Sequence, residues 1–219
     1  MNSVGDAFSY PFRSPGWFGT IVLQGLILII PIIGQIALLG WLLKNMDNLR
    51  EGRQELAPAG FHLGRGIHLF GAELVYGIAL YIIPGILEGV GSAVYQNGNG
   101  SGAGLVLLTL GYLLNVVAGL LLAFLLPAVI LVTHEQGFSG AMNVGGVWRL
   151  ATLNVGNTIV AGLLIIVAQI LGAVGIVLCF IGVFLTQPYG HAVMAGVVDW
   201  YRRTQAQRAP ATPGPAPGM

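Results

Sequence analysis

The sequence has too few charged residues to cover the surface of a water-soluble globule. Asp, Glu, Lys and Arg make up 8% of its 219 residues, whereas 55% are hydrophobic. Soluble domains contain about 25% charged residues. The formal net charge of +1 is also too small for the clustered basic face that nucleic acids require. We therefore expect an integral membrane protein that contacts membrane lipids and binds no nucleic acid.

Cysteine and clusters of metal ligands are scarce as well. The single cysteine, Cys179, lies in an apolar run, where we expect a buried small hydrophobe and no disulfide. His62 and His68 are six residues apart without cysteines or clustered carboxylates nearby, and the adjacent side chains of His134 and Glu135 point in different directions. No strand–turn–helix context presents a nucleophile. The sequence predicts no metal, no cofactor and no enzyme activity.

Long hydrophobic runs, in contrast, are abundant. Crossing the hydrocarbon core takes about 20 apolar residues, and three windows have that length: Phe18–Leu43, Ile67–Gly89 and Ala103–Val132. A longer run, Thr158–Trp200, has roughly twice the length of one crossing and contains a glycine-rich stretch at Gly172–Gly182. It therefore predicts a helical hairpin, so we expect an all-α polytopic membrane protein with about five transmembrane segments.

The first window carries a helix-breaking signal at its centre. Pro31 removes a backbone donor and clashes with the preceding turn, and Gly34 follows it. The window crosses either once with a kink, which we favour, or as a re-entrant pair of short helices. The sidedness of the N-terminus depends on this choice.

Two shorter stretches, residues 6–18 and 137–154, mix aromatic and polar residues and predict interfacial amphipathic helices. Each precedes an apolar run and a helix that ends in charged residues, which resembles a weak internal repeat. Residues 1–203 are expected to form one integral membrane domain. Residues 204–219 are rich in Pro, Ala and Gly and are expected to be a disordered tail.

Basic residues predict the orientation, because Lys and Arg gather on the cytoplasmic side. They occur in three regions that should share that side: Lys44, Arg50, Arg53 and Arg65; then Arg149; then Arg202, Arg203 and Arg208. The connections at Tyr95–Gly104 and near Gly182 carry no charge and should face outward. We expect the cell (inner) membrane, with the basic loops and the C-terminus in the cytoplasm.

Several motifs resemble a known family. They are "GDAFSYPFRSPGW", the following "IPIIG" and "LLGWLLKNMDNLREG", and later "HEQGFSGAMNVGGVWRLATLNVGN" and "LCFIGVFLTQPYGHAVMAGVVDWYR". Together they resemble the prokaryotic multi-pass membrane family called domain of unknown function 4013, over nearly the whole chain except the tail. The chain departs from it at "LAPAGFHLG", where such proteins often show a Leu-Pro and a Trp. The resemblance implies a multi-pass membrane protein and no catalytic residues, because the family has no established activity.

Polar residues inside the apolar windows are the candidate functional groups. Glu73 lies within the second window, whereas Glu88 lies near its outer rim and should reach water. Asn115, Tyr189 and His191 are predicted at similar depth to Glu73. One hypothesis is an intramembrane polar site of Glu73, Asn115, Tyr189 and His191 that binds a proton, a cation or a lipid headgroup. The alternative, which we favour, is that these groups form hydrogen bonds between helices.

Three functions are compatible with these features. The favoured one is a non-enzymatic membrane scaffold or partner protein, with membrane-protein partners or homo-oligomers. The second is a small transporter or channel component that uses Glu73 and His191. A membrane-embedded enzyme is disfavoured because no catalytic set of carboxylates, His or Ser–Lys groups occurs. Small-residue pairs such as Gly85 and Gly89 are expected to be packing seams between helices.

Overall fold

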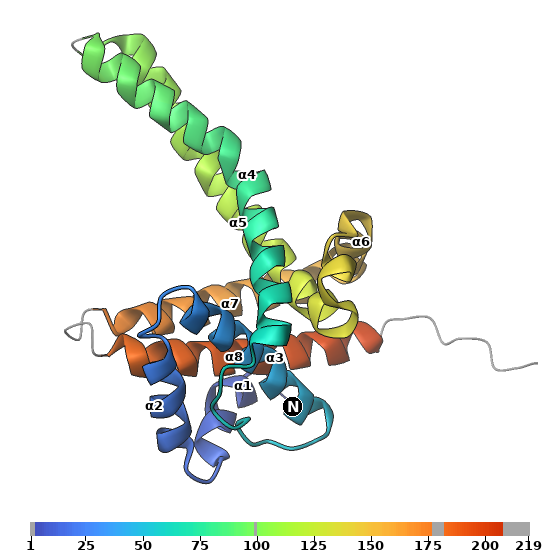
Figure 1. Cartoon of the computed structure of the whole chain (residues 1–219). Helices are drawn as coiled ribbons and strands as arrows, with labels where there is room; N and C mark the ends of the chain where they lie inside the picture. Colours follow the sequence, from blue (N-terminus) through green and yellow to red (C-terminus); the bar gives the residue numbers. More distant parts are fainter. Residues whose placement is uncertain (1–2, 99, 177–181, 208–219) are drawn as a thin grey trace, which may run out of the picture.

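The computed structural model describes residues 3–98, 100–176 and 182–207. In these ranges all regular elements are helical, as the sequence predicted. The elements in chain order are α1 (Asp6–Ser9), the 3-10 helix η1 (Tyr10–Arg13), α2 (Trp17–Ile27), α3 (Ile33–Arg50), α4 (Leu63–Asn97), α5 (Gly102–Ala141), α6 (Val144–Leu153), α7 (Val155–Val174) and α8 (Val183–Ala206). Figure 1 shows α4 and α5 as a long hairpin that rises from a body of the other helices.

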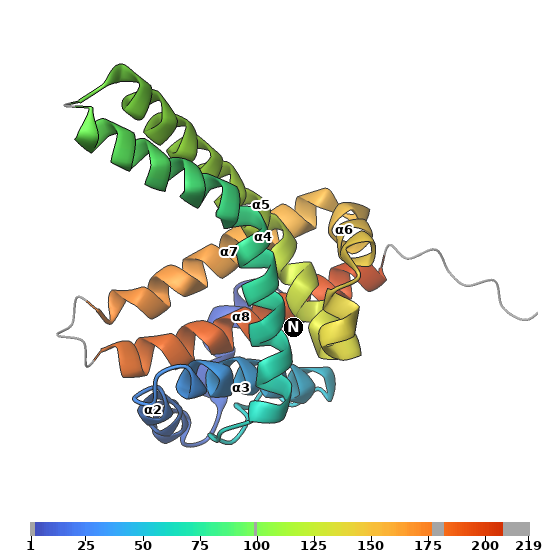
Figure 2. The same cartoon turned by 45° about the horizontal axis from the view of Figure 1, so that its top comes forward.

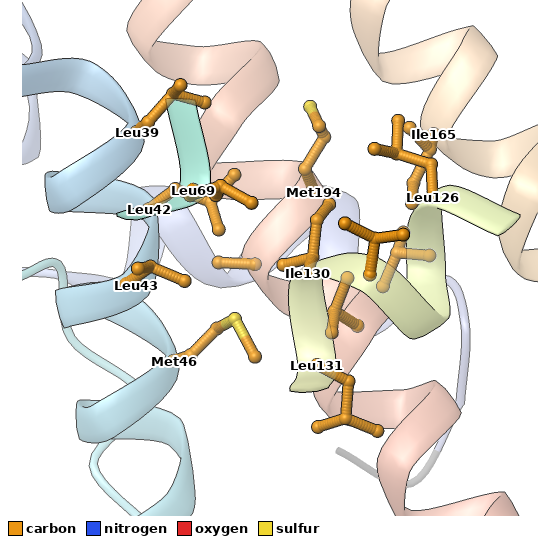
Figure 3. Packing of buried hydrophobic residues seen from close by; sticks show 14 of the residues in the cluster. Leu39, Leu42, Leu43, Met46, Leu69, Leu126, Ile130, Leu131, Ile165 and Met194 are labelled. Atoms are coloured by element: carbon orange, nitrogen blue, oxygen red, sulfur yellow. The ribbon is translucent and has the colours of Figure 1, made fainter. Parts of the chain in front are cut away.

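The body is organised around α3 and α8. Most side chains of α3 from Ala37 to Leu49 are buried, and α8 is buried almost continuously from Pro188 to Asp199. Figure 3 shows side chains from α3, α4, α5, α7 and α8 meeting in one hydrophobic cluster, in which Met194 of α8 lies centrally. Five helices thus share this core.

Within the described ranges, three helices are long and apolar enough to cross a membrane: α4, α5 and α7. Neither α8 nor either helix of the first window meets this criterion, so three of the about five expected crossings are supported by helix length and composition, and the count of five stays a prediction. Figures 1 and 2 show α7 and α8 side by side, as the hairpin over Thr158–Trp200 predicted. Cys179 lies outside the described residues. Helix α8 continues to Ala206, past the expected start of the tail.

The first window is divided by a break at residues 28–32. Helix α2 has 11 residues, and at about 1.5 Å per residue it is shorter than a hydrocarbon core of roughly 30 Å. Pro31 lies in the break, and the following Ile32 has φ 64°, a left-handed conformation that is rare for a β-branched residue. The signal read from Pro31 and Gly34 therefore marks the end of one helix and the start of the next.

Close approach of helix α4 to α3 depends on glycine. A Cβ on Gly66 would lie 2.0 Å from the carbonyl oxygen of Ile36, and a Cβ on Gly40 would lie 2.1 Å from that of His62. The two backbones therefore touch where α4 begins. By contrast, nothing described lies within 4 Å of a Cβ built on Gly85 or Gly89. The packing seam expected at this pair has no partner helix within the described chain.

Candidate functional site

The four residues of the predicted polar site make separate contacts. Tyr189 donates from its hydroxyl to the carbonyl oxygen of Phe8 at 3.0 Å, and His191 Nδ1 lies 2.9 Å from the carbonyl oxygen of Gln187, one turn earlier in α8. Among the described residues, no hydrogen bond joins any two of the four. Tyr189 thus connects the N-terminal segment to α8 by a hydrogen bond, and the imidazole of His191 contacts a backbone oxygen of its own helix.

Asn115 meets Glu88 and not Glu73. Its Nδ2 donates to Glu88 Oε1 at 3.1 Å inside the α4–α5 hairpin. The sequence analysis ended the second window at Gly89 and placed Glu88 at a wet rim, but α4 continues to Asn97. Glu88 therefore lies along the hairpin, where a neighbouring helix supplies its partner. This pair corresponds to the interhelical hydrogen bonding that was the favoured interpretation of the polar groups.

Glu73 makes no hydrogen bond or ion pair with the described residues. It lines a shallow, largely apolar hollow of about 470 Å³ on α4 with Leu74, Gly77, Ile78, Tyr81 and Ile82. All six residues belong to one helix, so the hollow lies on an outer face of the hairpin. Glu73 is thus the one member of the predicted site to which the described residues supply no hydrogen-bond partner.

A group of charged side chains that the sequence analysis did not assemble connects α3, α4 and α5. Asp47 of α3 accepts from Arg65 Nη1 of α4 through Oδ2 at 2.5 Å, and its Oδ1 lies 2.9 Å from His134 Nε2 of α5. Arg50 Nη1 lies 3.1 Å from His134 Nδ1, and Arg50 Nη2 donates to Glu135 at 3.2 Å. We call Asp47, Arg50, Arg65, His134 and Glu135 the charged cluster.

The geometry of the charged cluster assigns the protonation of its members. Burial raises the pKa of Asp47, but the charge of Arg65 and the hydrogen bonds from His134 and Arg65 outweigh it, so this pKa is below its usual value. Arg50 can only donate, so His134 Nδ1 must accept and Nε2 must carry the proton that Asp47 accepts. Asp47 is therefore a carboxylate and His134 a neutral imidazole.

A second ionic group lies at the end of α8. Asp199, whose side chain is 1% exposed, accepts from Arg202 at 2.7 Å and from Arg203 at 2.8 Å. Arg203 also donates to the carbonyl oxygen of Leu49 at 3.3 Å, which joins the end of α8 to the end of α3. Together with the charged cluster, these bonds gather basic residues of the first and third predicted regions at one end of the molecule. That this end faces the cytoplasm stays a prediction.

Metal chemistry has no preformed site in the part of the chain that the structure describes. No group of three or more His, Cys, Asp and Glu side chains is arranged there to hold an ion. In the charged cluster, one carboxylate oxygen of Asp47 already faces a guanidinium and the other an imidazole. The arrangement can hold helices together, and it leaves no open coordination position at Asp47.

No curated protein and no solved structure matches the chain. Residues 23–186 match the family described as protein of unknown function (DUF4013). The match begins within α2 and ends in the first turn of α8, so it covers the hairpin, the charged cluster and α7. It agrees with the resemblance drawn from the sequence motifs, and we conclude that the chain belongs to the DUF4013 family.

Proposed function

We propose that the protein is a non-enzymatic membrane scaffold or partner protein whose α4–α5 hairpin associates with other membrane helices. The observation that carries this proposal is the position of the hairpin. It extends beyond the body in Figures 1 and 2, and large apolar side chains such as Ile82, Ile86 and Leu113 are more than half exposed. A single packed bundle would need no such extension.

One face of α4 is suited to a close helix contact. Gly77, Gly85 and Gly89 are spaced by four or eight residues, and nothing described lies within 4 Å of a Cβ built on any of them. Small residues at such spacing let two backbones approach in lipid, where van der Waals packing drives association. We infer that a second membrane helix, from another copy or from a partner protein, packs along this face.

Disulfide cross-linking in membranes tests the association. In a Cys179→Ala background, Gly85→Cys and Gly89→Cys should each form a cross-linked dimer, or a heavier adduct with a partner protein. Ile83→Cys is the matched control, because Ile83 is 62% exposed and lies about half a turn away from Gly85. Equal cross-linking at all three positions, or none at the glycines, would contradict the proposal.

A small transporter or channel component is the second candidate, supported by the carboxyl group of Glu73, which has no partner among the residues that the structure describes. Ionisable groups within membrane helices usually face a cavity or a pathway. If Glu73→Gln and His191→Ala leave the fold intact but abolish pH- or ion-dependent flux in proteoliposomes, transport replaces the scaffold proposal. If flux is the same in the variants and the wild type, the transport candidate is excluded.

We also infer that the charged end of the molecule faces the cytoplasm of the cell in which the chain is made, following the distribution of Lys and Arg. A membrane-impermeant thiol reagent tests this on intact cells, in the Cys179→Ala background. Gln96→Cys, at the far end of the hairpin, should be labelled from outside. Ala59→Cys, in the loop before α4, should be labelled only after lysis, and the reverse pattern would invert the orientation.

A further inference from the structure

A cavity of about 410 Å³ lies between the end of α5 and α6, within the roughly 300–1,000 Å³ typical of small-ligand sites. It exists because α5 bends sharply at Gly137, which has φ 69° and a non-helical backbone. Beyond this bend the chain turns into α6, and Gly140 and Gly146 line the cavity without side chains that would fill it. Neither helix alone forms the site.

Both charge signs and two amides line this cavity. Arg149 projects from α6, and its guanidinium makes no ion pair or hydrogen bond with the described residues. Glu135 accepts a hydrogen bond from Arg50 through Oε1. Its other oxygen, Oε2, has no partner among the described residues. Asn143 caps α6 through its Oδ1, which accepts from the backbone of Gly146 at 3.0 Å. Its Nδ2 and the amide of Gln136 supply further donors at the wall.

The wall that carries Arg149 belongs to an amphipathic helix. Val147 and Ala151 of α6 are buried, whereas Val144 and Trp148 are 60% and 50% exposed. Trp148 also packs edge-on against Phe124 of α5, with ring centroids 6.1 Å apart. Because tryptophan favours the headgroup layer of a bilayer, we expect the cavity at headgroup depth, after the apolar run of α5.

We propose that this cavity binds the headgroup of a zwitterionic phospholipid of the phosphoethanolamine type. The planar guanidinium of Arg149 presents paired donors that fit a phosphate, and the amides of Asn143 and Gln136 add neutral donors. The free oxygen of Glu135 accepts from the ammonium group. A purely anionic headgroup would leave this oxygen of Glu135 without a donor, so the pattern of donors and acceptors favours a headgroup with both signs. This inference rests on membrane placement and not on association through the hairpin.

Native mass spectrometry of the full chain in detergent tests the site with added phosphatidylethanolamine or phosphatidylglycerol. Wild-type protein should retain phosphatidylethanolamine preferentially. Arg149→Gln should weaken this binding by roughly tenfold or more, because a charge-assisted contact is lost, and Arg149→Lys should lose less. Glu135→Gln should reduce the preference over phosphatidylglycerol. Circular dichroism and gel filtration establish that each variant is folded.

Arg53→Gln is the matched control, because Arg53 is an exposed arginine that pairs with Glu51, away from the cavity. If Arg53→Gln and Arg149→Gln lose the same amount of bound lipid, the loss reflects the general surface charge of the protein, and the proposal is overturned. Unchanged headgroup preference in Glu135→Gln would overturn the role of the ammonium group. Binding of free phosphoethanolamine as tightly as the lipid would show that a soluble phosphate compound, not a lipid, is the ligand. These readouts are separate from cross-linking at Gly85 and Gly89.

Discussion

His134 Nε2 lies 2.9 Å from Asp47 Oδ1, and this contact joins α5 to α3 across 87 residues of sequence. Arg65 approaches the other oxygen of the same carboxylate from α4. Three helices are thus held by one side chain. Because the side chain of His134 is 2% exposed and that of Asp47 is 20% exposed, this hydrogen bond is shielded from water, unlike an exposed ion pair, whose contribution would be about 0–1 kcal/mol.

Asp47→Asn should therefore destabilise the body of the protein. The amide presents only one acceptor oxygen, so it can replace the carboxylate towards His134 or Arg65 but not towards both. Since hydrogen bonds to charged groups contribute about 1.5–3 kcal/mol, we expect a loss of roughly 1–3 kcal/mol. The apparent unfolding temperature in detergent at neutral pH measures it. Glu55→Gln is the control, because Glu55 lies in an exposed loop and its side chain makes no hydrogen bond with the described residues. An equal effect of this substitution would contradict the role of Asp47.

The same carboxylate predicts how stability depends on pH. The pKa of Asp47 is lowered in the folded protein, whereas the pKa of an aspartate in the unfolded chain is about 3.9. The stabilisation is therefore fully present above the unfolded value and is lost as the pH falls through the lower, folded value. Unfolding temperatures of wild type and Asp47→Asn should differ at neutral pH and converge below about pH 4. A constant difference down to the most acidic pH would rule out the titration of Asp47 as the cause.

The N-terminal segment is fastened to α8 by a buried tyrosine. Tyr10 is 0% exposed, and its hydroxyl donates to the carbonyl oxygen of Ala192 at 2.9 Å. Tyr10→Phe should lower the free energy of unfolding by about 1 kcal/mol. This corresponds to an unfolding temperature lower by roughly 2–4 °C for a chain of this size. Trypsin should also cleave after Arg13 faster. Tyr112→Phe, at a side chain that is 60% exposed, should change neither readout.

Two glycines near the start of α4 should respond oppositely to the same substitution. A Cβ on Gly66 would overlap the carbonyl oxygen of Ile36, which is backbone and cannot move aside. Gly66→Ala should therefore lower the free energy of unfolding by at least about 3 kcal/mol, at the upper end of the effects of overpacking. Gly64 has open space around it, so Gly64→Ala should lie between no change and a gain of about 1 kcal/mol from helix propensity. Thermal unfolding of the two variants in the same detergent compares them directly.

The sequence was sufficient for the features that depend on local pattern. Apolar runs located α4, α5 and α7, and Pro31 with Gly34 located the break between α2 and α3. What it did not supply was the partner of each polar group, because that depends on how helices align. A hairpin aligns residues at similar distances from its turn, and Glu73 is much farther from the turn near residue 100 than Asn115 is. This simple register argument would have pointed from Asn115 towards Glu88.

The charged cluster was missed for a related reason. His134 and Glu135 were considered as a possible metal site by themselves, and their adjacency in sequence excluded it. Their partners, Asp47, Arg50 and Arg65, come from segments that the sequence treated as loop or helix end. The available signal was the coincidence of acidic and basic residues at the predicted cytoplasmic ends of three helices. Orientation rules used only the basic ones, so the pairing remained hidden until α3, α4 and α5 were packed together.

Double-mutant cycles test which carboxylate, that of Glu88 or that of Glu73, forms a hydrogen bond with Asn115. Residues in direct contact show coupling energies of about 0.5–3 kcal/mol, whereas distant ones are additive within roughly 0.3–0.5 kcal/mol. We expect Asn115→Leu to couple with Glu88→Gln, at the lower end of that range because hydrogen bonds between membrane helices average about 0.6 kcal/mol. Asn115→Leu and Glu73→Gln should be additive in the same assay. Coupling to Glu73 instead would restore the intramembrane polar site and would favour the transport candidate, since the hairpin would then have to realign to bring these side chains together.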